Sequence, residues 1–248
     1  MLAQALDPFI TFTGDLPDGF DERMAAGVWL RDYLHGLIDQ RRGEPRDDLI
    51  SGLIAAEEGG DQLTEEEIVA TCNLLLVAGH ETTVNLIANA ILAMLRHPAQ
   101  WGALGADPNR VSAVIEETMR YDPPVQLVGR IAGDDMTIGG VTGGQERSDR
   151  GSVTVAKGDT MMLLLAAAQH DPASIDRPDE FDPDRETIRH LGFGKGPHFC
   201  LGAPLARLEA SVALSAVTAR FPNARMASEP VYKPNLTLRG LATLDVKV

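Results

Sequence analysis

A glycine-rich segment near residue 200 constrains this chain more than any other part of its sequence. It runs from Phe193 to Gly202, reads FGKGPHFCLG and contains one cysteine, Cys200. Its glycines have no Cβ, so the backbone can turn tightly there and a flat, bulky ligand can approach it closely. Residues 201–220 have apolar side chains at helical spacing, and Pro222 lies just beyond them. The pattern predicts a loop that presents Cys200 at a helix N-terminus, where unpaired N–H groups and the helix dipole favour a thiolate.

The spacing Phe-Gly-x-Gly-x-His-x-Cys-x-Gly, followed by Leu205-Ala206-Arg207, resembles the haem-binding signature of the cytochrome P-450 family. The resemblance implies that Cys200 is the proximal ligand of the iron in haem b. A thiolate suits iron that is to cleave an O–O bond, because the sulfur pushes electron density onto the metal. The loop residues that the resemblance assigns to cofactor binding are Phe193, Gly194, His198, Cys200 and Gly202.

Two other interpretations of this loop are a buried cysteine beside a flexible turn and a zinc site. His198 and Cys200 could be two zinc ligands, but a tetrahedral site takes four. The only other cysteine, Cys72, lies on another predicted element and has no paired ligand nearby in the sequence. Zinc is therefore the weaker alternative, and Cys72 is predicted to be an ordinary core residue.

The centre of the longest predicted helix, residues 65–96, reads AGHETT at 78–83. A glycine inside a helix costs roughly 1 kcal/mol relative to alanine, and the two threonines are β-branched. Such a local conflict within a strong helix is typical of a functional site. Gly79 leaves room for a planar cofactor or dioxygen, and the Thr82 hydroxyl can bond a carbonyl one turn back and open the helix. The resemblance implies that Glu81 and Thr82 form the family's acid–alcohol pair for proton delivery; the alternative is threonines bonded to their own helix.

Glu117 and Arg120 are three residues apart, a favourable spacing for an ion pair on one helical face. The resemblance implies that they are the family's structural E-x-x-R pair, which stabilises the region of the cysteine loop. The third partner in the family is often the arginine of a Pro-x-Arg-Phe segment, but residues 178–181 read PDEF here. Arg185 or His190 could take its place, and the sequence does not choose between them.

Arg130 and His198 match positions at which the family contacts the haem propionates. An arginine suits this role because its fork matches the geometry of a carboxylate. The alternatives are a solvated strand arginine and a hydrogen-bonded loop histidine. The residues predicted to line an apolar substrate pocket are Leu75, Ala78, Val125, Gln126 and Leu127.

The predicted fold class is mainly α with a small β region. Apolar periodicity predicts helices at 25–42, 47–58, 65–96, 109–121 and 201–220. Thr64 and Glu67 have the spacing of a capping box, with Leu63 and Ile68 placed as a hydrophobic staple. Short β-branched stretches between Gly and Asp turns predict strands at 125–131, 136–138 and 153–155. The resemblance implies a cytochrome P-450 fold of which the chain holds the C-terminal portion only.

No repeat or linker divides the sequence, so a single domain over residues 1–248 is predicted. Its parts are a helix-rich region at 1–124, a small sheet with loops at 125–192, the cysteine loop and final long helix at 193–220, and C-terminal strands at 221–248. The family's N-terminal part is missing, so apolar residues at the centre of helix 65–96 and on one face of 201–220 are expected to face solvent. Residues 143–152 interrupt an expected strand connection, and their composition predicts a solvated loop.

The composition narrows the class of protein. Apolar residues make up 44% and charged residues 23%, as in soluble globular domains. A formal net charge of −14 argues against nucleic acid and anionic lipid as partners. Two distant cysteines form no disulfide framework, and no signal peptide is evident, so a cytoplasmic location is predicted. The longest apolar run, 161–168, is too short for a membrane span of about 20 residues.

Together these features predict a haem-thiolate monooxygenase that inserts one oxygen atom from dioxygen into a small apolar organic substrate. The electrons are expected from a separate ferredoxin or flavodoxin-type donor, because the sequence has no flavin or iron–sulfur motif of its own. The surface near Lys195 and Arg207 is the expected docking face for that donor. The alternative is a truncated, catalytically silent fragment or a partner-dependent haem-binding subunit.

Overall fold

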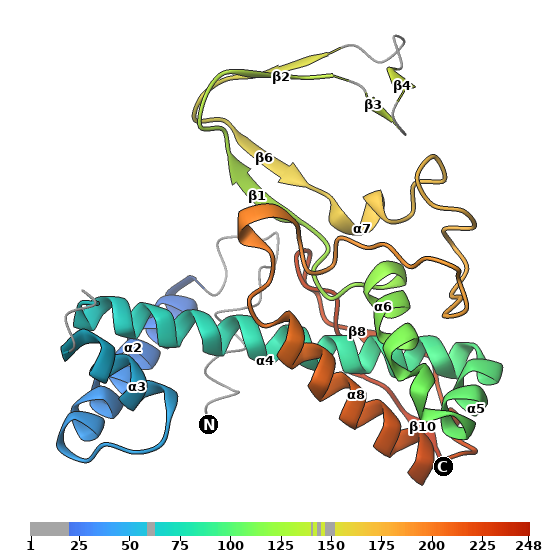
Figure 1. The fold of residues 1–248 in the computed structure, drawn as a ribbon, viewed down its shortest axis with the longest axis horizontal. Helices are drawn as coiled ribbons and strands as arrows, with labels where there is room; N and C mark the ends of the chain where they lie inside the picture. Colours follow the sequence, from blue (N-terminus) through green and yellow to red (C-terminus); the bar gives the residue numbers. More distant parts are fainter. Residues whose placement is uncertain (1–19, 59–62, 140, 143–144, 147–151) are drawn as a thin grey trace. The chain divides into compact units, whose positions relative to one another are not determined.

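The computed structural model describes residues 20–58, 63–139, 141–142, 145–146 and 152–248. Its helices are α2 (Phe20–Gly43), α3 (Leu49–Glu58), α4 (Glu65–Arg96), α5 (Pro98–Ala106), α6 (Val111–Tyr121), α7 (Leu165–Ala168) and α8 (Ala203–Arg220), with 3-10 turns η1 (Pro108–Arg110) and η2 (Gly196–His198) (Figure 1). The strands are short: β1 (Val128–Ile131), β2 (Met136–Ile138), β3 (Val141–Thr142), β4 (Gln145–Glu146), β5 (Val153–Val155), β6 (Thr160–Leu163), β7 (Arg225–Met226), β8 (Val231–Tyr232), β9 (Leu241–Thr243) and β10 (Val246–Lys247). The predicted class, mainly α with a small β region, is confirmed.

The chain divides into two compact units, the described residues up to Glu81 and the residues from Thr82 onward. The first unit contains α2, α3 and the beginning of α4. Its core consists of the buried residues Leu30, Leu34, Ile38, Ile54, Ile68, Val69 and Cys72. Burial raises the pKa of the Cys72 thiol. Cys72 is thus a core residue, as predicted.

The predicted capping box begins α4. The Thr64 N–H donates to Glu67 Oε2 at 2.7 Å, and the Glu67 N–H donates back to Thr64 Oγ1 at 3.3 Å. Hydrogen bonds from Thr64 also lower the pKa of the Glu67 carboxyl. Leu63 packs against the core cluster that contains Ile68, where the hydrophobic staple was expected. Local sequence therefore determines where this helix starts.

The second unit packs the end of α4 with α5, α6 and α8. Its buried core includes Leu86, Met94, Trp101, Leu104, Val114, Ile115, Met119, Phe193, Ala210 and Leu214. The helix predicted at 65–96 ends before His97 and Pro98, and α5 was not predicted. Proline terminates a helix, but it also suits the first turn of the next one, where its missing N–H costs no hydrogen bond.

The β region consists of two-stranded antiparallel pairs. β1 pairs with β6, so that Val128 lies opposite Leu163, and the chain continues into the pair of β2 and β5 (Figure 1). The apolar run 161–168 is divided between β6 and α7. In the segment 143–152, Gln145 and Glu146 form β4, which pairs with β3, rather than a loop. The rest of that segment lies outside the described residues, apart from Ser152.

An apolar, exposed stripe begins at Leu201, two residues before α8, and continues along one face of that helix. Leu201 is 86% exposed, and Leu205, Leu208 and Val212 continue the stripe at helical spacing. The opposite face of α8 is buried through Ala203, Ala210 and Leu214. Leu74 and Leu75, at the centre of α4, are also exposed. The expected exposure of both apolar surfaces is confirmed.

Among the described helices, α4 is long and apolar enough to cross a membrane, with a mean hydropathy of 1.2 over its most apolar 18 residues. No continuous apolar run in the sequence marks α4, because scattered polar residues interrupt its apolar residues without adding many charges. A core helix meets the same criterion. Leu86, Leu92 and Met94 of α4 are buried in the core of the second unit.

Candidate functional site

The cysteine loop is held by hydrogen bonds within its own backbone. Gly194 and Gly196 have φ values of 73° and 76°, in the left-handed region that glycine adopts without strain. The Gly194 N–H donates to the Leu191 carbonyl at 2.8 Å. The Cys200 N–H donates to the Phe193 carbonyl at 2.9 Å, which closes the loop across its two glycines. The position of Cys200 therefore depends directly on Phe193.

Cys200 lies just before α8, which begins at Ala203 with Gly202 as its N-cap residue. The Ala203 N–H donates to the Cys200 carbonyl at 3.3 Å. The thiol is free and half-buried. A Cβ added at Gly202 would lie 4.0 Å from Cys200 Sγ, so glycine keeps the space beside the sulfur open. The sequence prediction placed Cys200 at the helix start, and the structure places it two residues before the N-cap.

The Phe193 ring is buried and surrounded on several sides. Its centroid is 6.4 Å from that of Phe199, in an edge-on arrangement, and 5.7 Å from that of His190. The Arg207 guanidinium lies 4.5 Å from the same centroid, a cation–π distance. Contacts from both ends of the loop thus fix the ring whose backbone carbonyl binds Cys200.

Glu117 and Arg120 form the predicted ion pair on α6. Arg120 Nη2 lies 2.7 Å from Glu117 Oε1, and both side chains are fully buried. Arg120 also donates to the carbonyls of Pro178 at 2.7 Å and Glu180 at 2.8 Å. A buried pair of this kind is costly to break, because either charge alone would be left unpaired.

The third partner of this pair is Arg185. Its Nε donates to Glu117 Oε1 at 3.1 Å, and its guanidinium also binds the carbonyls of Arg177 and Glu180. His190, the other candidate, binds Glu116 instead, at 2.8 Å. The sequence could not decide between Arg185 and His190 as the third partner, because both follow the PDEF segment closely. The segment 176–185 is thereby attached to α6.

Sequence reasoning missed Glu116 and Gln169. Glu116 binds His190 and Arg207; burial opposes its ionisation, but hydrogen bonds from these two partners lower its pKa to about 2. Gln169 is buried, donates to the Met119 carbonyl at 3.2 Å and accepts the Leu191 N–H at 2.6 Å. It joins α6 to the start of the cysteine loop. Neither residue belongs to a recognisable motif, so only their neighbours in space indicate a role.

The AGHETT segment lies in an uninterrupted part of α4, so the expected opening of the helix at Thr82 is not observed. Gly79 is exposed, and a Cβ added there would meet no other atom within 4 Å. Glu81 is buried and Thr82 is half-buried. The first unit ends at Glu81 and the second begins at Thr82. The acid–alcohol role of these two residues stays a prediction.

Arg130 and His198 are both exposed, on β1 and η2 respectively. Arg130 Nη1 donates to the Gly129 carbonyl at 2.7 Å. In the part of the chain that the structure describes, neither side chain forms an ion pair. Their role as propionate ligands stays a prediction.

The residues predicted to line the substrate pocket lie in different units. Leu75 and Ala78 are exposed on α4 in the first, whereas Val125, Gln126 and Leu127 are half-buried before β1 in the second. The Gln126 side chain donates to the Pro123 carbonyl at 2.7 Å. The common pocket predicted for these five residues stays a prediction.

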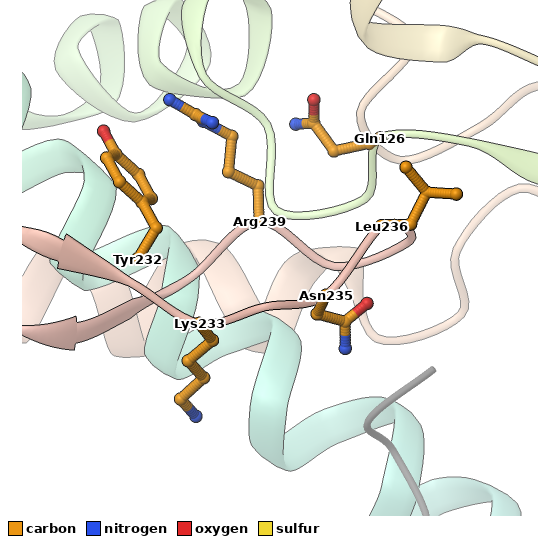
Figure 2. A pocket seen from close by; sticks show the side chains of 6 residues that line it. All are labelled: Gln126, Tyr232, Lys233, Asn235, Leu236 and Arg239. Carbon is orange, nitrogen blue, oxygen red and sulfur yellow. The ribbon is translucent and has the colours of Figure 1, made fainter. Parts of the chain in front are cut away.

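Two cavities in the second unit share Gln126 but not the cysteine loop. One, of about 200 Å³, is lined by Gln126, Tyr232, Lys233, Asn235, Leu236 and Arg239 (Figure 2). The other, of about 350 Å³, shares Tyr232 and Arg239 with it. Arg239 pairs with Asp122 at 2.7 Å and lies 4.1 Å from the Tyr232 ring centroid. Burial raises the pKa of Asp122, although Arg239 opposes the shift. Neither cavity is the cofactor site, since Cys200 lines neither.

A family model described as cytochrome P-450 matches residues 2–104 and 110–243 of this sequence. The chain belongs to the cytochrome P-450 family. Cytochrome P-450 107B1 of Saccharopolyspora erythraea is 42% identical over 246 residues, which are 97% of this chain and 58% of that protein. The vitamin D(3) 25-hydroxylase of Pseudonocardia autotrophica is 41% identical over 98% of this chain and 59% of its own length. The ligand-free crystal structure of Mycobacterium smegmatis CYP164A2 superimposes with a TM-score of 0.90 at 65% identity, covering all of this chain and 61% of that one.

The chain thus spans about 60% of the length of these relatives. The family's cofactor is haem b, and the residues around Cys200 fit it. A half-buried free thiol would offer a soft ligand to the haem iron, and Gly202 leaves the space beside the sulfur free. Among the described residues, no group of three or more His, Cys, Asp or Glu side chains could hold a metal ion. The described structure therefore gives the zinc alternative no support.

Proposed function

We propose that this protein is a haem-thiolate monooxygenase in which Cys200 would bind the haem iron, and that it inserts one oxygen atom from dioxygen into a small apolar organic substrate. The cysteine loop carries this proposal, because its glycines and hydrogen bonds present one free thiol just before the N-terminus of α8. Bound haem would supply the activation of dioxygen. The similarity to a protein named as a hydroxylase supports the same class of reaction.

Backbone hydrogen bonds on both sides hold Cys200 in place. The Cys200 N–H is bound to the Phe193 carbonyl and the Cys200 carbonyl accepts the Ala203 N–H, so the residue is held on both sides. Cys200 also lies two residues before the N-cap of α8, near the positive end of the helix dipole. Phe193, Gly194 and Gly202 would contact the cofactor or leave room for it. Arg130 and His198 would bind its two propionates, as exposed groups that can offer N–H donors.

On α4, we assign proton delivery to Glu81 and Thr82. The Thr82 hydroxyl would hold a proton at Oγ1, and the Glu81 carboxyl group would replace it with a proton taken from solvent. Gly79 would leave the backbone open to a flat ligand, since nothing lies within 4 Å of a Cβ added there. A Thr82→Ala variant is expected to consume reductant without forming product and to release peroxide. Coupling equal to that of the wild type would remove Thr82 from the mechanism.

The substrate proposal rests on residue character. Leu75, Ala78, Val125 and Leu127 are apolar, and Gln126 has its amide bound to the Pro123 carbonyl. Apolar side chains of this kind favour an apolar organic molecule, because burial of apolar surface stabilises the complex of protein and substrate. The net charge of −14 makes a nucleic acid an unsuitable partner.

We further propose a cytoplasmic location and a separate electron donor of the ferredoxin or flavodoxin type. The sequence contains two cysteines, too few to bind an iron–sulfur cluster of its own. Lys195 is exposed on the cysteine loop and is available for a docking contact. Arg207, also expected on that face, has its guanidinium bound to Glu116. Its contribution to docking is therefore smaller than the sequence suggested.

The test of the haem-thiolate proposal is the spectrum of the purified chain after haem loading, reduction and treatment with carbon monoxide. We expect the thiolate-type shift of the Soret band, and we expect Cys200→Ala to lose this shift or to lose haem. Cys72→Ala is the matched control, because Cys72 is buried in the first unit, and it should keep the shift. A folded, haem-loaded wild type without the shift would contradict the proposal and support a catalytically silent chain.

A further inference from the structure

A second charged cluster lies beside the Glu117–Arg120 pair and binds a different part of the chain. Its centre is Glu116, which precedes Glu117 on α6. Successive helix residues point about 100° apart, so the two carboxylates face different neighbours. Glu116 Oε1 accepts from Arg207 Nε at 2.6 Å, and its Oε2 accepts from Arg207 Nη2 at 2.9 Å. This is a bidentate pair, the geometry that fixes an arginine most specifically.

His190 completes the cluster. Its Nε2 lies 2.8 Å from Glu116 Oε2, and its ring is almost fully buried. Its Nδ1 accepts the Gly192 N–H at 3.1 Å, so the proton of the ring is on Nε2 and is donated to Glu116. A Cβ added at Gly192 would lie 2.9 Å from the Met119 carbonyl oxygen, which shows how closely this backbone approaches α6.

The two partners of Glu116 stand at opposite ends of the cysteine loop. His190 immediately precedes the loop residues 191–202, and Arg207 lies near the start of α8. One carboxylate on α6 therefore holds both ends of the loop. The Glu117 group binds the segment 176–185 instead, so the two clusters act on different parts of the chain.

The contacts continue from the cluster to the cysteine. The Arg207 guanidinium is 4.5 Å from the Phe193 ring centroid, and the His190 ring is 5.7 Å from it. The carbonyl of the same phenylalanine accepts the Cys200 N–H at 2.9 Å. A shift of Arg207 or His190 would thus move Phe193, and with it the hydrogen bond that orients Cys200.

We propose that Glu116, His190 and Arg207 are positioning residues for Cys200, which hold the cysteine loop in one arrangement independently of the Glu117 group. The proposal rests on the proposed haem-thiolate function for its consequence, a single arrangement of Cys200 toward the haem. Its structural part, that the cluster keeps residues 191–202 in one ordered conformation, can be measured separately.

The experiment compares Arg207→Met with Arg220→Met in the full chain after haem loading. Arg220 is a matched control, since it lies on the same helix and its guanidinium is 5.5 Å from the ring of Phe221, far along α8 from the cysteine loop. Amide hydrogen exchange of residues 191–202, followed by mass spectrometry, should be about tenfold faster in Arg207→Met and unchanged in Arg220→Met. Arg207→Lys should be intermediate, because lysine keeps the charge but cannot form the fork.

A spectrum separates positioning from general destabilisation. In the reduced, carbon monoxide-treated state, Arg207→Met should lose part of the thiolate-type Soret shift at unchanged haem content, at a temperature well below its unfolding midpoint. Glu116→Gln, which has nearly the same volume, repeats both measurements should Arg207→Met fail to fold. Exchange and spectra equal to those of Arg220→Met would overturn the proposal. If the wild type lacks the thiolate shift, the proposed function fails, and the exchange comparison alone still decides whether the cluster orders the loop.

Discussion

The cysteine loop and the AGHETT segment both contain glycines at places that resemble functional sites of the family, but the structure supports them differently. Around the loop, a Cβ at Gly192 would collide with Met119, and side chains from α6 and α8 hold both loop ends. On α4, a Cβ at Gly79 would meet nothing within 4 Å, and Leu74 and Leu75 are exposed nearby. The loop is therefore ordered by contacts of the second unit, whereas Gly79 of the AGHETT segment has open space around it.

The largest effect should come from breaking the buried charged group at Glu117, which attaches the segment 176–185 to α6. Glu117→Ala leaves Arg120 and Arg185 buried without their carboxylate and should lower the free energy of unfolding by about 3–5 kcal/mol. Urea unfolding followed by circular dichroism measures this. Glu180→Ala removes an exposed pair with Arg177 and should cost less than about 1 kcal/mol. Equal losses in the two variants would show that the buried group does not stabilise the fold specifically.

Next in size is the loop glycine that approaches α6. Gly192→Ala places a methyl group 2.5 Å from Met119 Cε and 2.9 Å from the Met119 carbonyl oxygen. The side chain can move but the backbone oxygen cannot easily do so, and overpacking of this kind costs about 1–3 kcal/mol. Thermal unfolding of the variant measures the loss. A midpoint equal to that of the wild type would mean that the loop can move away from α6 at little cost.

In the AGHETT segment, a glycine-to-alanine substitution should raise the stability of the chain instead of lowering it. Gly79→Ala meets no neighbour and replaces glycine inside a helix, so it should stabilise the chain by up to about 1 kcal/mol. The same thermal scan gives the comparison with Gly192→Ala. A destabilised Gly79→Ala variant would show that this part of α4 is packed in the folded protein.

The smallest effect concerns pH. The pKa of Glu116 is lowered to about 2 in the folded chain, against about 4.3 for an unperturbed glutamate. Its contribution to stability is therefore present above the unfolded pKa and is lost as the pH falls from about 5 towards 2. Urea midpoints of the wild type and Glu116→Gln should differ at pH 6, differ by about half as much at pH 3, and converge only near pH 2. A difference that stays constant over this range would show that the Glu116 charge does not stabilise the fold.

Sequence reasoning found the helices whose apolar spacing is regular. The predicted 65–96 helix coincides with α4 because the Thr64–Glu67 capping box and the His97-Pro98 step are local signals. The failure at α5 came where one pattern fits two structures, because Pro98 ends one helix and starts another. No element was predicted for the apolar run 161–168, which contains both a strand and a helical turn. Short apolar runs do not distinguish helix from strand, so the pairing of β6 with β1 decided which residues form the strand.

By itself the sequence determined the family, the cysteine loop and the ion pair at 117 and 120, since glycine freedom, cysteine chemistry and helical spacing are local properties. Only the tertiary structure chose Arg185 over His190 as the partner of Glu117. It alone showed that Glu116 joins both ends of the cysteine loop. The physical reason is that a charged side chain pairs with the groups that lie within hydrogen-bond distance of it in the folded chain. Those groups come from segments far apart in the sequence, so the residues of one segment do not identify them.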